Sequence, residues 1–330
     1  MAAVGYIQLV TIVLTGQLNN TIIRPVEHII SVDQLTKRYK DLTAVDHISF
    51  QVRPGEIFGI LGPNGAGKTT TLEMMEGLKV ITEGDAVING ISVKQHPRQV
   101  KHIIGVQLQS SSFYDLMNLK ELLEFFGSLY GRKVDGMALL TKVELADKWK
   151  SRAKELSGGQ RQRLSIAVAL VNDPLVIFLD EPTTGLDPQA RRHLWALVRD
   201  IQKAGTTLIL TTHYMEEAEV LCDRIAIMDS AKIIAQDTPT GLLKLIEQKA
   251  TIKFQVKNHL DIAPLKQLAA ATDVNRMKDT ITISTSHVQD TLKGLIEYDL
   301  THPVHFTDLQ VHEVNLEDVF LNLTGKTLRD

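Results

Sequence analysis

From residue 57 to residue 69 the chain runs Ile57-Phe58-Gly59-Ile60-Leu61-Gly62-Pro63-Asn64-Gly65-Ala66-Gly67-Lys68-Thr69. The first five residues form an apolar run that predicts a buried strand, and the next eight match the pattern G-x-x-x-x-G-K-[ST]. A helix is predicted from Lys68 to Glu76, ending at Gly77. A strand, a glycine-rich loop and a helix in this order are typical of α/β proteins with a largely parallel sheet.

The glycine-rich loop predicts a phosphate-binding site. Glycines allow the backbone to curl so that its N–H groups point at phosphate oxygens, and the following helix N-terminus adds partial positive charge. We expect Lys68 to contact the β- and γ-phosphates of ATP and the Thr69 hydroxyl to ligate Mg²⁺. The alternative is a tight strand-to-helix turn that binds nothing. The predicted binding residues are Gly62, Pro63, Asn64, Gly65, Ala66, Gly67, Lys68, Thr69 and Thr70.

A second apolar run, Leu175 to Leu179, ends in the carboxylates Asp180 and Glu181. An interior parallel strand has this composition, and its carboxyl end opens onto the ligand crevice. Asp180 suits a magnesium-binding role there, directly or through water. Glu181 points the opposite way and could act on the attacking water as a general base. A simple charged strand exit is the alternative, which the phosphate loop disfavours.

A third motif, Leu156-Ser157-Gly158-Gly159-Gln160, opens another predicted helix, with Ser157 as a suitable N-cap. A capped helix end with two glycines is a second anion site. Because one ATP has one triphosphate tail, two such sites favour a sandwich in which each ATP lies between two subunits. With these motifs the sequence resembles the ABC transporter ATPases over about residues 29–245.

The resemblance implies roles for further residues. Gln109 would contact magnesium and report to a membrane partner, although Gln107 nearby could be mistaken for it. His213 would touch the γ-phosphate, Asp187 would couple the paired sites, and Tyr39 would stack on adenine. A lone histidine after a strand or a lone tyrosine is more often structural, so these roles depend on the resemblance.

The chain divides into three predicted parts. Residues 1–23 contain no charged side chain, and residues 1–27 are expected to form a poorly ordered extension. Residues 28–245 should form the ATPase domain, a P-loop NTPase fold with a mixed sheet core, an antiparallel β subdomain and a helical insertion at about 107–165. Residues 250–330 should form a small α+β accessory domain. Within it, 251–256, 280–284 and 304–311 alternate like strands, whereas 265–271 and 288–298 look helical.

Composition excludes several other classes. The net charge of −3 gives no basic field for nucleic acid, and the single Cys222 excludes an internal disulfide. The apolar run from Val4 to Leu14 is too short to span a bilayer, for which about 20 residues are needed.

The resemblance therefore implies an ATP-hydrolysing subunit on the cytoplasmic face of the plasma (inner) membrane, paired with a second ATPase subunit and a separate permease. The tail from Asn315 to Gly325 resembles ATPases that export drugs, antibiotics, lipids or ions. An importer subunit is one alternative. A non-transport ABC ATPase of translation or DNA repair is another, although the chain has one set of motifs and no long coiled coil.

Overall fold

The computed structural model describes residues 27–108, 113–114, 116–246, 250–256, 260–302, 304 and 306–325. The predictions made for residues 1–26 and for Gln109 lie outside this range. Among the described residues, no helix is both long and apolar enough to cross a membrane.

A six-stranded sheet of order β10-β9-β3-β8-β7-β6 forms the centre of the larger unit. All neighbouring pairs are parallel except β10 with β9, which confirms the predicted mixed sheet. Strands β3, β7 and β8 are buried along their whole length, as their continuous apolar character requires. The strands are β3 (Ile57–Leu61), β6 (Ile104–Gln107), β7 (Val176–Asp180), β8 (Thr207–Thr212), β9 (Arg224–Asp229) and β10 (Lys232–Asp237).

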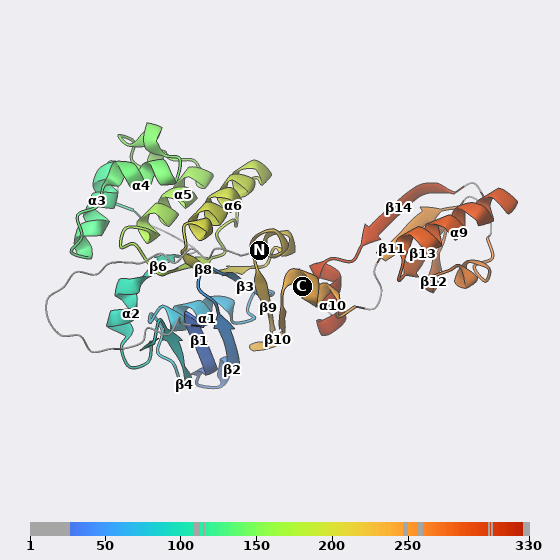
Figure 1. The fold of residues 1–330 in the computed structure, drawn as a ribbon, viewed down its shortest axis with the longest axis horizontal. Coiled ribbons are helices and arrows are strands. Elements are labelled where there is room, and N and C mark those ends of the chain that lie inside the picture. Colours follow the sequence, from blue (N-terminus) through green and yellow to red (C-terminus); the bar gives the residue numbers. More distant parts are fainter. Residues whose placement is uncertain are drawn as a thin grey trace, which may run out of the picture.

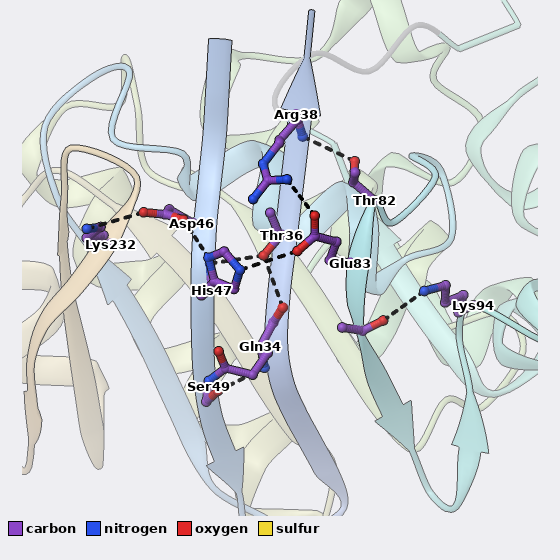
Figure 2. A network of polar contacts seen from close by, with 11 residues as sticks. Gln34, Thr36, Arg38, Asp46, His47, Ser49, Thr82, Glu83, Lys94 and Lys232 are labelled. Carbon is purple, nitrogen blue, oxygen red and sulfur yellow. Dashed lines mark hydrogen bonds and ion pairs between the residues drawn. The ribbon is translucent and has the colours of Figure 1, made fainter. Parts of the chain in front are cut away.

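An antiparallel sheet of order β2-β1-β4-β5 packs on one side of the central sheet, as predicted (Figure 1). Its outer surface carries a polar network in which His47 lies between Asp46 (2.6 Å) and Glu83 (3.3 Å) (Figure 2). Lys232 contacts Asp46 at 3.2 Å and so joins β10 to this sheet. The strands are β1 (Ile30–Tyr39), β2 (Leu42–Val52), β4 (Glu83–Ile88) and β5 (Ile91–Ser92).

Helices α3 to α8 cover the other side of the central sheet, and α3, α4 and α5 form the predicted helical insertion (Figure 1). Helices α1 and α2 instead pack in the core that the central sheet shares with the antiparallel sheet. Asn118 and Ser157 cap α3 and α5 through reciprocal hydrogen bonds with Glu121 and Gln160, which fixes where both helices begin. The helices are α1 (Lys68–Met75), α2 (Pro97–Ile103), α3 (Leu119–Leu129), α4 (Gly136–Lys142), α5 (Gly158–Ala169), α6 (Pro188–Lys203), α7 (Met215–Leu221) and α8 (Pro239–Leu243).

A smaller antiparallel sheet, ordered β12-β13-β11-β14, has its own core with α9 (Val288–Thr301). Strands β11 (Ala250–Gln255), β13 (Thr280–Thr285) and β14 (Thr307–Glu313) lie near the predicted positions. The helix predicted at 265–271 is wrong, because only the 3-10 turn Leu265–Gln267 forms. The chain takes a left-handed conformation at Ala270 and then enters strand β12 (Ala271–Met277), which the sequence did not predict.

The last helix, α10 (Leu316–Thr324), belongs to a different core from the sheet that precedes it. Leu316, Val319 and Phe320 are buried with residues of α7 and α8, and the Leu316 backbone N–H donates to Glu219 Oε1 at 2.8 Å. The chain therefore leaves the larger unit after α8, builds the small sheet, and returns to the larger unit through α10.

Candidate functional site

The phosphate loop joins β3 to α1 in a conformation that requires glycine. Gly65 and Gly67 have φ of +82° and +106°. A Cβ at Gly67 would lie 2.4 Å from the carbonyl oxygen of Ala44, and one at Gly62 would lie 2.1 Å from that of Met228. The glycines thus permit both the curl of the loop and its close packing on neighbouring backbone.

The Lys68 side chain lies inside this loop and is only 4% exposed. Its ammonium donates to the carbonyls of Gly62 (2.9 Å) and Pro63 (3.0 Å), and lies 3.4 Å from Glu181 Oε1. Burial lowers the pKa of Lys68, and Glu181 partly opposes that shift. A buried cation at the N-terminus of a helix is a strong site for an anion.

Asp180 ends β7 beside the loop. Its carboxylate accepts hydrogen bonds from Thr69 Oγ1 (3.1 Å) and from Thr211 Oγ1 (2.5 Å). Burial raises the pKa of Asp180, while these two hydroxyls act in the opposite direction. The sequence singled out Thr69 but missed Thr211, whose position follows from the parallel register that pairs Asp180 with Thr211.

Oxygen donors at this edge fit a magnesium ion. No group of three or more His, Cys, Asp or Glu side chains in the described part of the chain is arranged to hold a metal. Magnesium does not need one, because it is commonly bound by one or two protein oxygens together with waters and substrate phosphates. Thr69 Oγ1 and the Asp180 carboxylate supply such oxygens beside the phosphate loop.

Glu181 turns the chain away from β7 with a φ of +45°. Its backbone N–H donates to Thr211 Oγ1 at 3.0 Å, which fixes the turn. The carboxylate lies between Lys68 and His213 Nδ1, the latter 3.2 Å from Oε2. Burial acts to raise the pKa of Glu181, but these two neighbours outweigh it and the net shift is downward. Glu181 is therefore ionised and able to accept a proton.

A cavity of about 610 Å³ opens in front of the loop. Tyr39, Lys68, Thr69 and Glu181 all line it, so the structure brings the predicted aromatic residue and the predicted catalytic carboxylate to one site. Further lining residues are Leu42, Thr43, Ala44, Asn64, Gly65, Gly67, Thr70, Ser230 and Ala231.

The N-terminus of α5 forms a second, separate cavity of about 200 Å³. Ser157, Gly159 and Gln160 line it together with Asp187, whose side chain caps α6 by accepting from the N–H groups of residues 189 and 190. None of these residues lines the cavity at Lys68. One chain thus carries two distinct helix N-termini suited to anions, and Glu181 lies at only one of them.

Gln107, the other glutamine of its segment, is 1% exposed, and its Nε2 donates to the Leu108 carbonyl at 2.6 Å. Neither described cavity has Gln107 in its lining.

The family assignment follows from sequence similarity across nearly the whole chain. A family model described as "ABC transporter" matches residues 45–184. The linearmycin resistance ATP-binding protein of Bacillus subtilis is 36% identical over 310 residues, which cover 91% of this chain and 100% of that protein. The chain belongs to the ABC transporter ATP-binding proteins.

Other relatives of this ABC protein are similar over a comparable length. The Nod factor export ATP-binding protein I of Ralstonia nicotianae is 38% identical, covering 92% of this chain and 95% of that one. A solved ATP-binding subunit of an ABC transporter superposes with a TM-score of 0.59 at 26% identity, covering 66% of this chain and 92% of that one. A dimeric cassette bound to ADP and phosphate superposes with a TM-score of 0.58 at 25% identity, covering 63% and 98%. The predicted fold class and ATPase family are thereby confirmed.

Proposed function

We propose that this ABC ATPase energises export through a separate membrane permease, working as a pair of ATPase subunits on the cytoplasmic face of the inner membrane. The observation that carries the pairing is the presence of two separate cavities at helix N-termini on one chain, at Lys68 and at Ser157. Export is supported by the relatives, which are named for antibiotic resistance and for Nod factor export.

In the proposed reaction, Lys68 and the loop N–H groups hold the phosphates, while Thr69 and Asp180 hold Mg²⁺. When bound there, the ion would supply positive charge that neutralises the phosphate oxygens. Glu181 takes a proton from the attacking water, and Lys68 and His213 keep that carboxylate ionised until it does.

Three further assignments complete the proposal. Tyr39 stacks on the adenine ring. Asp187 lies beside residues 157–160 at the start of α5, and it contacts the nucleotide-binding region of the partner subunit. Gln109, assigned by resemblance, links magnesium to the permease.

Substituting Gly158 by Asp tests whether ATP is shared between two subunits. An added Cβ has room, its nearest atom being Leu186 Cδ2 at 3.9 Å, and an acidic residue is favourable in the first turn of a helix. The variant should fold and bind ATP at the Lys68 site with wild-type affinity. Its negative charge at the second site should lower steady-state hydrolysis by about tenfold or more, since anion binding there loses more than about 1.4 kcal/mol.

Gly158→Ala is the matched control, because it adds the same Cβ without charge. Phosphate release and equilibrium binding of a fluorescent ATP analogue should be measured for both variants. Hydrolysis that is equal in the Asp and Ala variants would mean that the ATP site is complete within one chain.

Copurification tests the transport assignment. The chain should be expressed with a polytopic membrane subunit encoded beside its gene, and pulled down through an affinity tag in mild detergent. We expect a stable complex whose ATPase rate responds to reconstitution in vesicles. Recovery with ribosomes or DNA, and no membrane subunit, would favour the alternative in translation or DNA repair. ATP-driven uptake into the cell by the complex would favour an importer.

A further inference from the structure

Glu217 is a fully buried carboxylate that the proposed reaction does not use. It lies in α7, one helical turn after His213, and its side chain is 0% exposed. Trp195 Nε1 donates to its Oε1 at 3.0 Å, which joins α7 to α6. Burial raises the pKa of Glu217, whereas Thr212, Thr183, Trp195 and Arg191 act to lower it. The carboxylate is therefore surrounded by hydroxyls and one cation.

Three buried polar atoms, Glu217 Oε2, Thr183 Oγ1 and Arg191 Nε, make no hydrogen bond of ordinary geometry with any of the described residues. Thr183 and Arg191 are nevertheless close enough to the Glu217 carboxyl to lower its pKa. The three atoms are chemically complementary, because Oε2 accepts whereas the hydroxyl and the guanidinium donate. Buried polar groups are normally paired, so three complementary atoms without such a bond around one carboxylate mark an arrangement that a small shift would complete.

Thr183 and Arg191 each lie close in sequence to one of the two proposed ATP-binding regions. Thr183 lies two residues after Glu181, in the loop that follows β7. Arg191 lies one turn after Asp187, whose carbonyl accepts from the Arg191 N–H at 3.0 Å. The Arg191 guanidinium also lies over the Tyr214 ring, 4.5 Å from its centroid, and that ring contacts His213 with centroids 4.1 Å apart. Glu217 thus lies between the turn that follows Glu181, the segment of His213 and the start of α6.

A purely structural role accounts for less of this arrangement. The bond from Trp195 holds α6 and α7 together, but a glutamine side-chain oxygen would accept it equally well. Burying a carboxylate is more costly than burying an amide, and that cost is offset where a cation and hydroxyls converge on the charge. Burial outweighs these groups, and the net shift of the Glu217 pKa is upward. The presence of a carboxyl rather than an amide at this cost points to a function with Arg191 and Thr183.

We propose that Glu217 is a positioning residue that couples the paired ATP sites. When the two subunits close on ATP, its Oε2 accepts from Thr183 and Arg191, so that His213 at one site and Asp187 beside the other move as one body. This inference rests on the proposed function, since it requires two nucleotide sites shared between subunits.

Glu217→Gln tests the inference, with Trp195→Phe as the matched control. The Gln variant keeps the acceptor for Trp195 and loses the charge for Arg191. We expect unchanged thermal stability and ATP affinity, a kcat lowered by about ten- to a hundredfold, as for one hydrogen bond to a charged group, and a Hill coefficient for ATP that falls to 1. The Phe variant keeps the carboxylate, so it should lose thermal stability but keep both kcat and the Hill coefficient.

Wild-type kcat and cooperativity in Glu217→Gln would overturn the inference, and so would parallel losses of stability and kcat in both variants. Non-cooperative hydrolysis by the wild-type protein, with no ATP-dependent dimer, would instead overturn the proposed pairing itself. Measuring the wild type in the same assay therefore separates failure of this inference from failure of the proposed function.

Discussion

Replacing Glu181 by Gln should lower steady-state ATP hydrolysis by about 10²–10⁴-fold, the usual contribution of a general base. The amide has nearly the same shape and can still accept hydrogen bonds from Lys68, but it cannot take a proton from water. ATP binding should therefore persist. Because hydrolysis is what reopens the proposed sandwich, the variant should accumulate as an ATP-bound dimer.

Phosphate release measures the first effect, and light scattering with and without Mg-ATP measures the second. Glu216→Gln is a suitable control, because Glu216 is an exposed carboxylate in the first turn of α7 near the same sheet edge. Its turnover should equal that of the wild type. Undiminished hydrolysis in Glu181→Gln would assign proton transfer to another group.

Glu76→Gln should remove a large pH dependence of stability. Glu76 follows α1 and is 2% exposed, and burial, with the charges of Asp180 and Glu73, raises its pKa from 4.5 to about 8. Between these two pH values the folded protein keeps a proton that the unfolded chain releases. The stabilisation is complete below about pH 4.5 and is lost as pH rises through 8, by at most about 5 kcal/mol.

Urea unfolding of the nucleotide-free protein at pH 5 and pH 8 measures this effect. The wild type should lose more stability between the two pH values than Glu76→Gln, and the variant should be the more stable protein at pH 8. Glu216→Gln is the control, because Glu216 is an exposed carboxylate in α7 that does not act on Glu76. Equal pH slopes for the wild type and Glu76→Gln would contradict the assignment.

The central sheet could be predicted from sequence because its strands are buried on both faces. Residues 57–61 and 176–179 are short runs without a charged or polar side chain, as expected for strands that are buried on both faces. The small sheet was harder to predict. Strand β12 lies at its edge and buries only Val274 among polar neighbours, so its sequence lacks a strand pattern. The alanines just before β12 favoured a helix in the sequence-based prediction. The left-handed backbone at Ala270 is not helical, so that helix does not form.

The phosphate-loop and carboxylate residues could be placed from sequence because each is a short motif beside its own strand. Thr211 and Glu217 could not, since their contacts with Asp180 and Trp195 join residues 31 and 22 positions apart in the sequence. The pairing of Thr211 with Asp180 depends on the register of β8 against β7. The contact of Glu217 with Trp195 depends on how α7 packs against α6.

The return of α10 to the larger unit gives the small sheet two anchors instead of one. A domain joined by a single linker can rotate freely, whereas a domain joined at both ends transmits its displacement to its two attachments. Here those attachments are α8 and α7, and α7 begins just after His213. Displacement of the small sheet would therefore act on α7 next to His213, and a chain ending at residue 245 would lack Phe320 and its packing in the core of the larger unit.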